Sequence, residues 1–427
     1  MNGAEMDNFD QLIMACVKEG FTDVHIAGGH PLVFRKHGKL LFNKGMVLSH
    51  QEVDGLVAKL LNPRQMQTLR SRWSVDFAMS VNHVRIRINV FSNTRGLSLA
   101  IRLLSGSIPT IEQLNLISSL KEFCALPAGL LLICGATGSG KSTTIASMVD
   151  WINRTRSVHV ITLEDPIEYR YTSKKSFVQQ RELGTHFPSF ERGLLDVLRE
   201  DPDVIVVGEL REAEVMRLTL NAAESGHLVI ATLHSTNAEE ALYRICNSFP
   251  LEAQEIVRFQ LSSTLAGVVV QQLDYNERAG FRVPHLSIMR GTSASKGTIR
   301  DNKLSQIESV MQTSFEKGMY TKERYKTEFL DKMTFFNPPG DTFKPSREST
   351  PEPVYTSPLL EGNGPVTEAK TRRPATVKGS EAKTPLPRSK GTEEQGLEEE
   401  NGNYIIEEQA SMEELIAQLH QEGIYRE

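Results

Sequence analysis

Over the first hundred residues, the apolar and polar positions show two periodicities, one typical of strands and one typical of helices. Four segments have the pattern of strands, and two repeat apolar residues at helical spacing. The strand segments are Asp23–Ile26, Leu32–Arg35, Val84–Val90 and Ser98–Leu103. The helical segments are Asp10–Glu19 and His50–Leu61. This mixture predicts a small α+β domain over residues 1–105, followed by a linker over 106–116.

From residue 117 the pattern changes to continuous apolar runs, which are typical of strands buried on both faces of a sheet. The runs are Gly129–Cys134, Val158–Glu164, Val204–Gly208 and His227–Leu233. Helical stretches separate them, at Ser142–Asn153, Phe190–Arg199 and Ala213–Ser225. Two helices broken at Pro250 and a hairpin of Gly267–Leu273 with Arg282–Met289 follow. The alternation predicts a three-layer α/β domain over residues 117–337.

Proline, serine, threonine and glutamate dominate the chain from Pro338 onward. A segment with so few large apolar residues cannot bury enough surface to offset the entropy of ordering, so we expect residues 338–427 to be mostly disordered. Ser411–His420 regains helical amphipathicity, with Ser411 and Glu414 spaced as a capping box. The pattern allows this terminal helix either to fray in solvent or to dock on a partner.

Net charge, cysteine spacing and the lengths of apolar stretches limit the kinds of protein that this chain can be. The formal net charge of -5 over 427 residues provides no overall basic character, so we expect no nucleic-acid partner. The 4 cysteines stand too far apart for a local zinc site, and no apolar stretch is long enough to span a membrane. No secretory leader opens the chain. These features predict a cytoplasmic protein.

The strongest chemical signal is a glycine loop between the first apolar run and the helical stretch that follows it. Gly135–Ser142 matches G-x-x-x-x-G-K-[ST] at every fixed position, in the expected strand–loop–helix context. Backbone amides of such a loop bind phosphate oxygens, Lys141 reaches the β- and γ-phosphates, and Ser142 holds Mg²⁺. We expect ATP to be bound by Gly135, Ala136, Thr137, Gly138, Ser139, Gly140, Lys141, Ser142 and Thr143.

Acidic residues and a histidine follow the other apolar runs. Glu164 is placed to orient or deprotonate a water, and Asp165 to order the turn or assist the Mg²⁺ shell. Glu209 directly follows the third run and is expected to bind Mg²⁺ through water. His234 follows the fourth run, where parallel strands end at one sheet edge, and is predicted to sense the γ-phosphate. A shape-forming Asp-Pro turn and a structural histidine are the alternatives.

Six arginines are candidates for neutralising phosphate charge. They are Arg199 and Arg211 in the α/β domain and Arg85, Arg87, Arg95 and Arg102 in the first domain. The first two would act within the subunit or across an interface, or form surface ion pairs. Arg85 and Arg87 share one strand face, and spacing alone favours a solvated cationic surface for the set of four.

Together these segments resemble the secretion-ATPase superfamily of P-loop motors. The superfamily has a Walker A motif, an acidic box, a Walker B motif ending in Gly-Glu, and a His box. These occur here in order at Gly135–Ser142, Glu164–Glu168, Asp203–Glu209 and Gly226–His234. The resemblance implies a RecA-like ATPase domain after a PAS-like domain, a homo-hexamer, and ATP with Mg²⁺ bound near subunit boundaries. It also implies Glu164 as catalytic base and Arg87, Arg95 and Arg102 as interface sensors.

Within the superfamily, three segments are most similar to the type IV pilus retraction branch: Asp165–Tyr169, Val257–Leu261 and Gly318-Met319. The four-cysteine zinc insertion of the assembly and type II secretion branches is absent. Membership would imply a motor that removes pilin subunits, acting on an inner-membrane platform protein from the cytoplasmic face, with no membrane contact of its own. Ala294–Asp301 only partly matches the branch, which leaves an accessory retraction ATPase or a secretion or DNA-uptake motor as alternatives. A nucleotide-binding scaffold without turnover is the alternative of another class.

Overall fold

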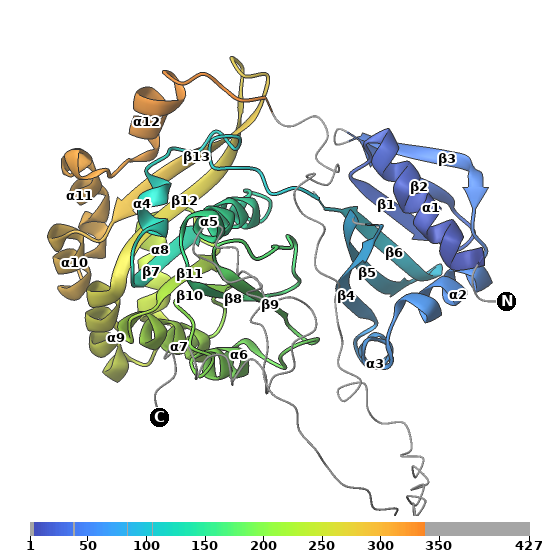
Figure 1. Cartoon of the computed structure of the whole chain (residues 1–427), viewed down its shortest axis with the longest axis horizontal. Helices are drawn as coiled ribbons and strands as arrows, with labels where there is room; N and C mark the ends of the chain where they lie inside the picture. Colours follow the sequence, from blue (N-terminus) through green and yellow to red (C-terminus); the bar gives the residue numbers. More distant parts are fainter. Residues whose placement is uncertain (1–3, 37–38, 83, 105, 338–427) are drawn as a thin grey trace, which may run out of the picture. The chain divides into compact units, whose positions relative to one another are not determined.

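The computed structural model describes residues 4–36, 39–82, 84–104 and 106–337, so the predicted tail and terminal helix lie outside the described residues. The described chain builds two sheets (Figure 1). The first has six strands in the order β3-β2-β1-β6-β5-β4, and every neighbouring pair is antiparallel. Its strands are β1 (Asp23–Ala27), β2 (Pro31–Lys36), β3 (Lys39–Val47), β4 (Ser74–Val81), β5 (Val84–Asn93) and β6 (Gly96–Leu103).

Three helices accompany the first sheet: α1 (Ala4–Glu19), α2 (His50–Leu60) and α3 (Pro63–Arg72). Ile13 and Cys16 of α1 are buried with the inward residues of β5, whose pattern alternates between buried and half-buried positions. The strands β3 and β4 were not predicted. All nine residues of β3 are exposed at the sheet edge, so no hydrophobic alternation marks it in the sequence.

The second sheet has seven strands in the order β13-β12-β7-β11-β10-β8-β9, and all but β13 are parallel. They are β7 (Gly129–Cys134), β8 (His159–Glu164), β9 (Phe177–Glu182), β10 (Val204–Val207), β11 (Leu228–Leu233), β12 (Leu265–Asn276) and β13 (Phe281–Arg290). The predicted apolar runs are the central strands, and the predicted hairpin is β12–β13. The α/β fold is confirmed, whereas β9 was missed.

Helices cover both faces of the second sheet (Figure 1). One face packs α4 (Leu120–Cys124) and α5 (Lys141–Thr155). The other packs α6 (Phe190–Val197), α7 (Ala213–Glu224), α8 (Ala238–Asn247) and α9 (Leu251–Thr264). After β13 come α10 (Ser293–Arg300), α11 (Ile307–Thr313) and α12 (Lys322–Tyr325).

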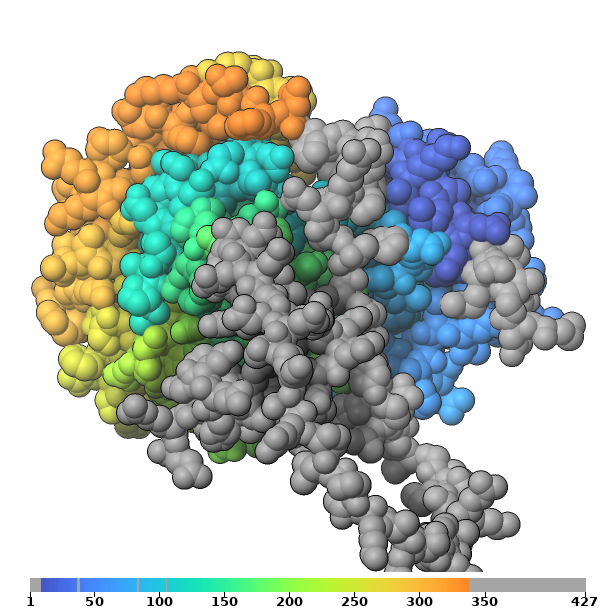
Figure 2. Space-filling view, in the orientation of Figure 1, coloured from blue at the N-terminus to red at the C-terminus, as the bar shows by residue number. Residues whose placement is uncertain are grey.

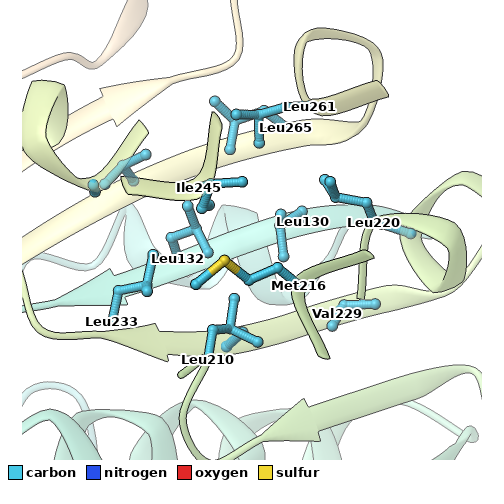
Figure 3. Close-up of a cluster of buried hydrophobic side chains, with 14 of the residues drawn as sticks. Leu130, Leu132, Leu210, Met216, Leu220, Val229, Leu233, Ile245, Leu261 and Leu265 are labelled. Atoms are coloured by element: carbon cyan, nitrogen blue, oxygen red, sulfur yellow. The ribbon is translucent and has the colours of Figure 1, made fainter. Parts of the chain in front are cut away.

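The strand β7 explains why the central runs are continuously apolar. Leu131 and Ile133 enter the core beside α5, while Leu130 and Leu132 enter the core on the opposite face. There they meet side chains of β11 and of α7, α8 and α9 (Figure 3). Cys134 is a buried core residue, as predicted, and all four cysteines are buried and unpaired. Each strand residue therefore faces a core on one side or the other.

The two ends of the α/β domain are tied together. Asn115 donates through Nδ2 to the carbonyl of Phe336 at 3.0 Å and accepts from the Phe336 amide at 2.7 Å. The last described residues, orange in Figure 2, lie beside the cyan segment that begins this domain. Ile111 and Leu116 are buried in the same core, so the segment predicted as a linker contributes to that core from Ile111 onward.

Candidate nucleotide site

The glycine loop forms the turn between β7 and α5. Gly140 is the N-cap of α5 with a φ of 87°, a left-handed conformation that favours glycine. Gly135 also has a positive φ, and a Cβ at that position would clash with the backbone oxygen of Gln271. A side chain therefore does not fit where the loop begins, which explains a glycine at this position.

Lys141 is the first residue of α5, and its ammonium group turns back over the loop. Nζ donates to the carbonyls of Gly135 at 2.7 Å and Ala136 at 3.0 Å. Burial lowers the pKa of Lys141, and the negative charge of Glu209 opposes that shift. The lysine is thus held against the loop that it would serve when phosphates arrive.

Gln271 of β12 supports the loop from the interior. Its Nε2 donates to the Ser139 carbonyl at 2.7 Å, and its Oε1 accepts from the Thr144 hydroxyl at 2.7 Å. The loop tip at 136–138 and the side chain of Ser142 remain exposed. The sequence analysis did not identify Gln271. The pattern that could have pointed to it is a polar residue within the apolar run of β12.

Glu164 ends β8 at the same sheet edge. Its Oε1 accepts from the Thr162 hydroxyl at 2.6 Å and from Gln180 Nε2 at 3.0 Å. Burial raises the pKa of Glu164 to about 7, against the opposing effect of these two donors. A carboxyl group that titrates near neutrality suits a general base. Asp165 follows it on the surface, where partial burial raises its pKa and Arg211 opposes the shift.

Glu209 follows β10, and its two carboxylate oxygens contact the side chains of Arg211 and His234. Arg211 Nη2 lies 2.6 Å from its Oε2, and His234 Nε2 lies 3.3 Å from its Oε1. Burial by itself would raise the pKa of Glu209, but Arg211, His234 and Lys141 together outweigh it and lower the pKa. The carboxylate is therefore held ionised at the sheet edge where the glycine loop lies.

The arginines of the first sheet divide into different environments. Arg87 forms an ion pair with Asp76, and its Nη1 lies 3.8 Å from Glu168. Arg102 pairs with Asp23 at 2.9 Å. Arg95 is exposed in the β5–β6 turn. Two of the three predicted sensors are thus engaged within the first domain, and only Arg87 also lies near the acidic box.

Arg85 contacts the acidic box more closely than Arg87, Arg95 or Arg102 does. Its Nε donates to the Ile167 carbonyl at 3.1 Å, and its Nη2 lies 3.0 Å from Glu182. Glu182 in turn accepts from the Ile167 amide at 3.1 Å. The sequence placed Arg85 beside Arg87 but gave no sign of its partners, because these lie on segments more than eighty residues away.

Arg199 is not brought to this edge within one subunit. It lies just beyond α6 and ahead of β10, and it is exposed. Since β10 runs from that end toward Glu209, Arg199 belongs to the opposite edge of the sheet from the glycine loop. Arg211, in contrast, contacts Glu209 directly.

The donor set at this edge fits a magnesium ion bound together with a nucleotide. Mg²⁺ prefers hydroxyl, carboxylate and water oxygens. Ser142 supplies a hydroxyl and Glu209 and Asp165 supply carboxylates. Across the described part of the chain, no group of three or more His, Cys, Asp and Glu side chains is arranged to hold a metal ion. A magnesium ion at a nucleotide site takes most of its ligands from phosphates and waters, with one or two from the protein.

Comparison with known proteins identifies the family to which the chain belongs. The family described as Type II/IV secretion system protein matches residues 7–323. The chain belongs to this family. Within the described residues, no helix is long and apolar enough to cross a membrane.

Two curated relatives and one solved structure illustrate the similarity. The uncharacterized protein YggR of Escherichia coli K12 is 40% identical over 315 residues, covering 74% of this chain and 95% of YggR. The type IV pilus retraction ATPase PilT of Pseudomonas aeruginosa is 39% identical over 312 residues, covering 73% of this chain and 90% of PilT. A crystal structure of the pilus retraction motor PilT with bound ADP has a TM-score of 0.70 at 38% identity, covering 79% of this chain and 97% of that one.

Proposed function

We propose that this family member is an ATP-hydrolysing motor subunit that works in a ring of six identical chains and powers retraction of a type IV pilus. The observation that carries the proposal is the convergence of Lys141, Glu164, Glu209 and His234 on one edge of a parallel sheet, beside the glycine loop. Ligands of open α/β sheets bind at this edge. The similarity to PilT over most of both chains supports the direction of the motor.

Hydrolysis in this site needs a base, and Glu164 has the environment of one. A water attacks the γ-phosphorus of ATP, its proton passes to Glu164, and the bond to the ADP oxygen breaks. Lys141 neutralises charge on the phosphate oxygens. Magnesium held by Ser142, Asp165 and Glu209 supplies further charge neutralisation when bound. The raised pKa of Glu164 lets it accept a proton near neutral pH.

The contact between Glu209 and His234 provides a means to report the γ-phosphate. His234 is only part-exposed and already touches Glu209. A γ-phosphate near the loop competes for the imidazole, and its departure returns the imidazole to the carboxylate. Arg87, Arg95 and Arg102 would read the nucleotide from a neighbouring subunit. Arg211 would neutralise phosphate charge within the subunit, and Arg199, which lies at the opposite edge, would do so across a subunit interface.

The partner proposed for the ring is the inner-membrane platform protein of the pilus, with the motor on the cytoplasmic side of that membrane. Two alternatives remain within the enzymes, namely an accessory retraction ATPase and a motor for secretion or DNA uptake. The partial match of Ala294–Asp301 to the retraction branch is the observation that keeps them open. A regulatory scaffold would bind ATP without turnover.

Steady-state hydrolysis by the purified chain tests the enzymatic part. We expect turnover that requires Mg²⁺ and disappears in Lys141→Ala, while thermal stability changes little because the hydrogen bonds given for the ammonium group go to carbonyls of the loop itself. Normal turnover by a folded Lys141→Ala protein would contradict the site. ATP binding without any turnover by the wild-type ring would favour the scaffold.

Deletion of the gene in its host tests the direction. We expect pili that extend but do not shorten, and loss of twitching. A strain without pili would make the chain an assembly motor. A strain that changes only after a second retraction ATPase is removed would make it the accessory motor.

A further inference from the structure

Gln180 of β9 lies beside Glu164 because β8 and β9 pair in parallel, with Thr162 opposite Gln180 and Glu164 opposite Glu182. The amide of Gln180 makes three hydrogen bonds. Nε2 donates to Glu164 Oε1 at 3.0 Å and to the Tyr169 carbonyl at 2.7 Å, and Oε1 accepts from the Tyr171 amide at 2.9 Å. Each of its polar groups therefore has a partner of the matching kind.

The backbone partners fix which way the amide points. A carbonyl can only accept and an amide N–H can only donate, so a flipped Gln180 would lose both backbone hydrogen bonds. Nε2 must therefore face Tyr169, and its second hydrogen must face Glu164. The backbone of Tyr169 and Tyr171, just after the acidic box, therefore orients Gln180 so that its Nε2 donates to the Glu164 carboxylate.

The same oxygen of Glu164 receives the second donor. The Thr162 hydroxyl contacts Oε1 at 2.6 Å, so both hydrogen bonds made to this carboxylate by described side chains fall on Oε1. With Oε1 held by two donors, the carboxylate cannot rotate freely, and Oε2 keeps its lone pairs for a water. The plane and position of the carboxylate follow from Gln180 and Thr162.

A further contact connects this arrangement to the glycine loop. Tyr169, whose carbonyl is held by Gln180, places its hydroxyl 3.0 Å from Thr143 Oγ1 in the first turn of α5. Gln180 is therefore tied both to Glu164 and, through Tyr169, to the helix that begins with Lys141. The distance between the base and the loop is set partly through this side chain.

We propose that Gln180 is a positioning residue for hydrolysis, which holds Glu164 with Oε1 occupied and Oε2 available to take a proton from water. The inference rests on the proposed function of Glu164 as the base. Gln180 acts through Glu164 and contacts no part of the glycine loop itself, so its removal lowers kcat and leaves the affinity for ATP nearly unchanged.

The test uses the full chain with Gln180→Leu and Gln180→Glu. Leucine removes all three hydrogen bonds, whereas glutamate keeps an acceptor for the Tyr171 amide and removes both donors. Because misplacement of a reacting group by about 1 Å costs about 100-fold, we expect kcat to fall by about 100-fold in both, with the KM for ATP within about twofold. Gln179→Leu and Gln179→Glu are the matched controls, since Gln179 contacts His159 on the other side of the strand, and both should keep the wild-type kcat.

A double-mutant cycle separates positioning from a structural role. In a Glu164→Gln background, Gln180→Leu should not lower the residual rate further, because the group through which it acts is already gone. A kcat within threefold of wild type in both Gln180 variants overturns the inference. So does a loss that persists in the Glu164→Gln background or that accompanies weaker ATP binding. A wild-type chain without turnover contradicts the proposed function instead.

Discussion

His234 Nε2 lies 3.3 Å from Glu209 Oε1, and this contact joins residues that follow two different strands of the parallel sheet. It exists because β10 and β11 pair in register, with Val207 opposite Ala231. The chain reaches Glu209 two residues after Val207 and His234 three residues after Ala231, so the two side chains meet at the same edge. The same geometry brings the end of β8 and the start of the glycine loop to this edge, and the predictions below follow from it.

Glu164→Gln and Glu209→Gln should fail in different ways. Glutamine at 164 cannot accept a proton, so the protein should bind ATP and retain it uncleaved. Glutamine at 209 removes a charge that faces Lys141 and His234, so hydrolysis should require more Mg²⁺. Nucleotide retained after rapid desalting and Mg²⁺ titration of the rate would distinguish them. The reverse pattern would mean that the two roles are exchanged.

The stability of the protein should fall with rising pH because of Glu164. Its pKa is about 7 in the folded chain against an unfolded value of 4.5, so between these values the folded state binds more protons than the unfolded state. The free energy of unfolding therefore decreases as pH rises through this window, by up to about 3 kcal/mol for this group. Glu164→Gln should match the wild type at pH 4.5 and exceed its melting temperature at pH 8.

An exposed carboxylate provides the control for that measurement. Glu255 is exposed on α9, and Glu255→Gln removes the same charge without relieving burial. Its melting temperature should follow the wild type at both pH values. Equal stability of wild type and Glu164→Gln at pH 8 would show that the carboxylate is solvated in the folded protein.

Replacing Gln271 should loosen the glycine loop. Gln271→Leu leaves the Ser139 carbonyl and the Thr144 hydroxyl without their partner in a buried place, at a cost of about 1–3 kcal/mol. If about 1.4 kcal/mol of this appears in binding, the affinity for ATP falls about tenfold. Titration with a fluorescent ATP analogue measures it. Gln272→Leu, on the next position of the strand, should bind as the wild type does.

Truncation after Asn337 should preserve hydrolysis and the oligomeric state. The family match ends at residue 323, and the cut keeps both hydrogen bonds between Asn115 and Phe336. Asn115→Ala in the truncated chain removes these two hydrogen bonds between the ends of the domain. We expect the free energy of unfolding to fall by about 1–3 kcal/mol, and the melting temperature to fall with it. Size-exclusion chromatography and an ATPase assay check both variants. Dissociation of the truncated ring would assign the tail a role in assembly.

The sequence by itself determined the features that depend on neighbours in the chain. The glycine loop, the apolar central strands and the acids that follow them are local patterns, because residues of a strand, a tight turn and a helix are constrained by adjacent positions. Parallel pairing then made it reasonable to expect Glu164, Glu209 and His234 at one edge. The order of the strands was not part of that expectation.

Only the tertiary structure decided which distant side chains complete the site. Gln180 reaches Glu164 because β9, which carries no clear apolar pattern, adds to the sheet beside β8. Gln271 reaches the loop from β12, and Arg85 reaches Ile167 from another sheet. Such contacts join residues 16 to 132 positions apart, so no local periodicity encodes them. Burial of the apolar residues fixes the register of the strands, and that register places the polar side chains of the same strands next to their distant partners.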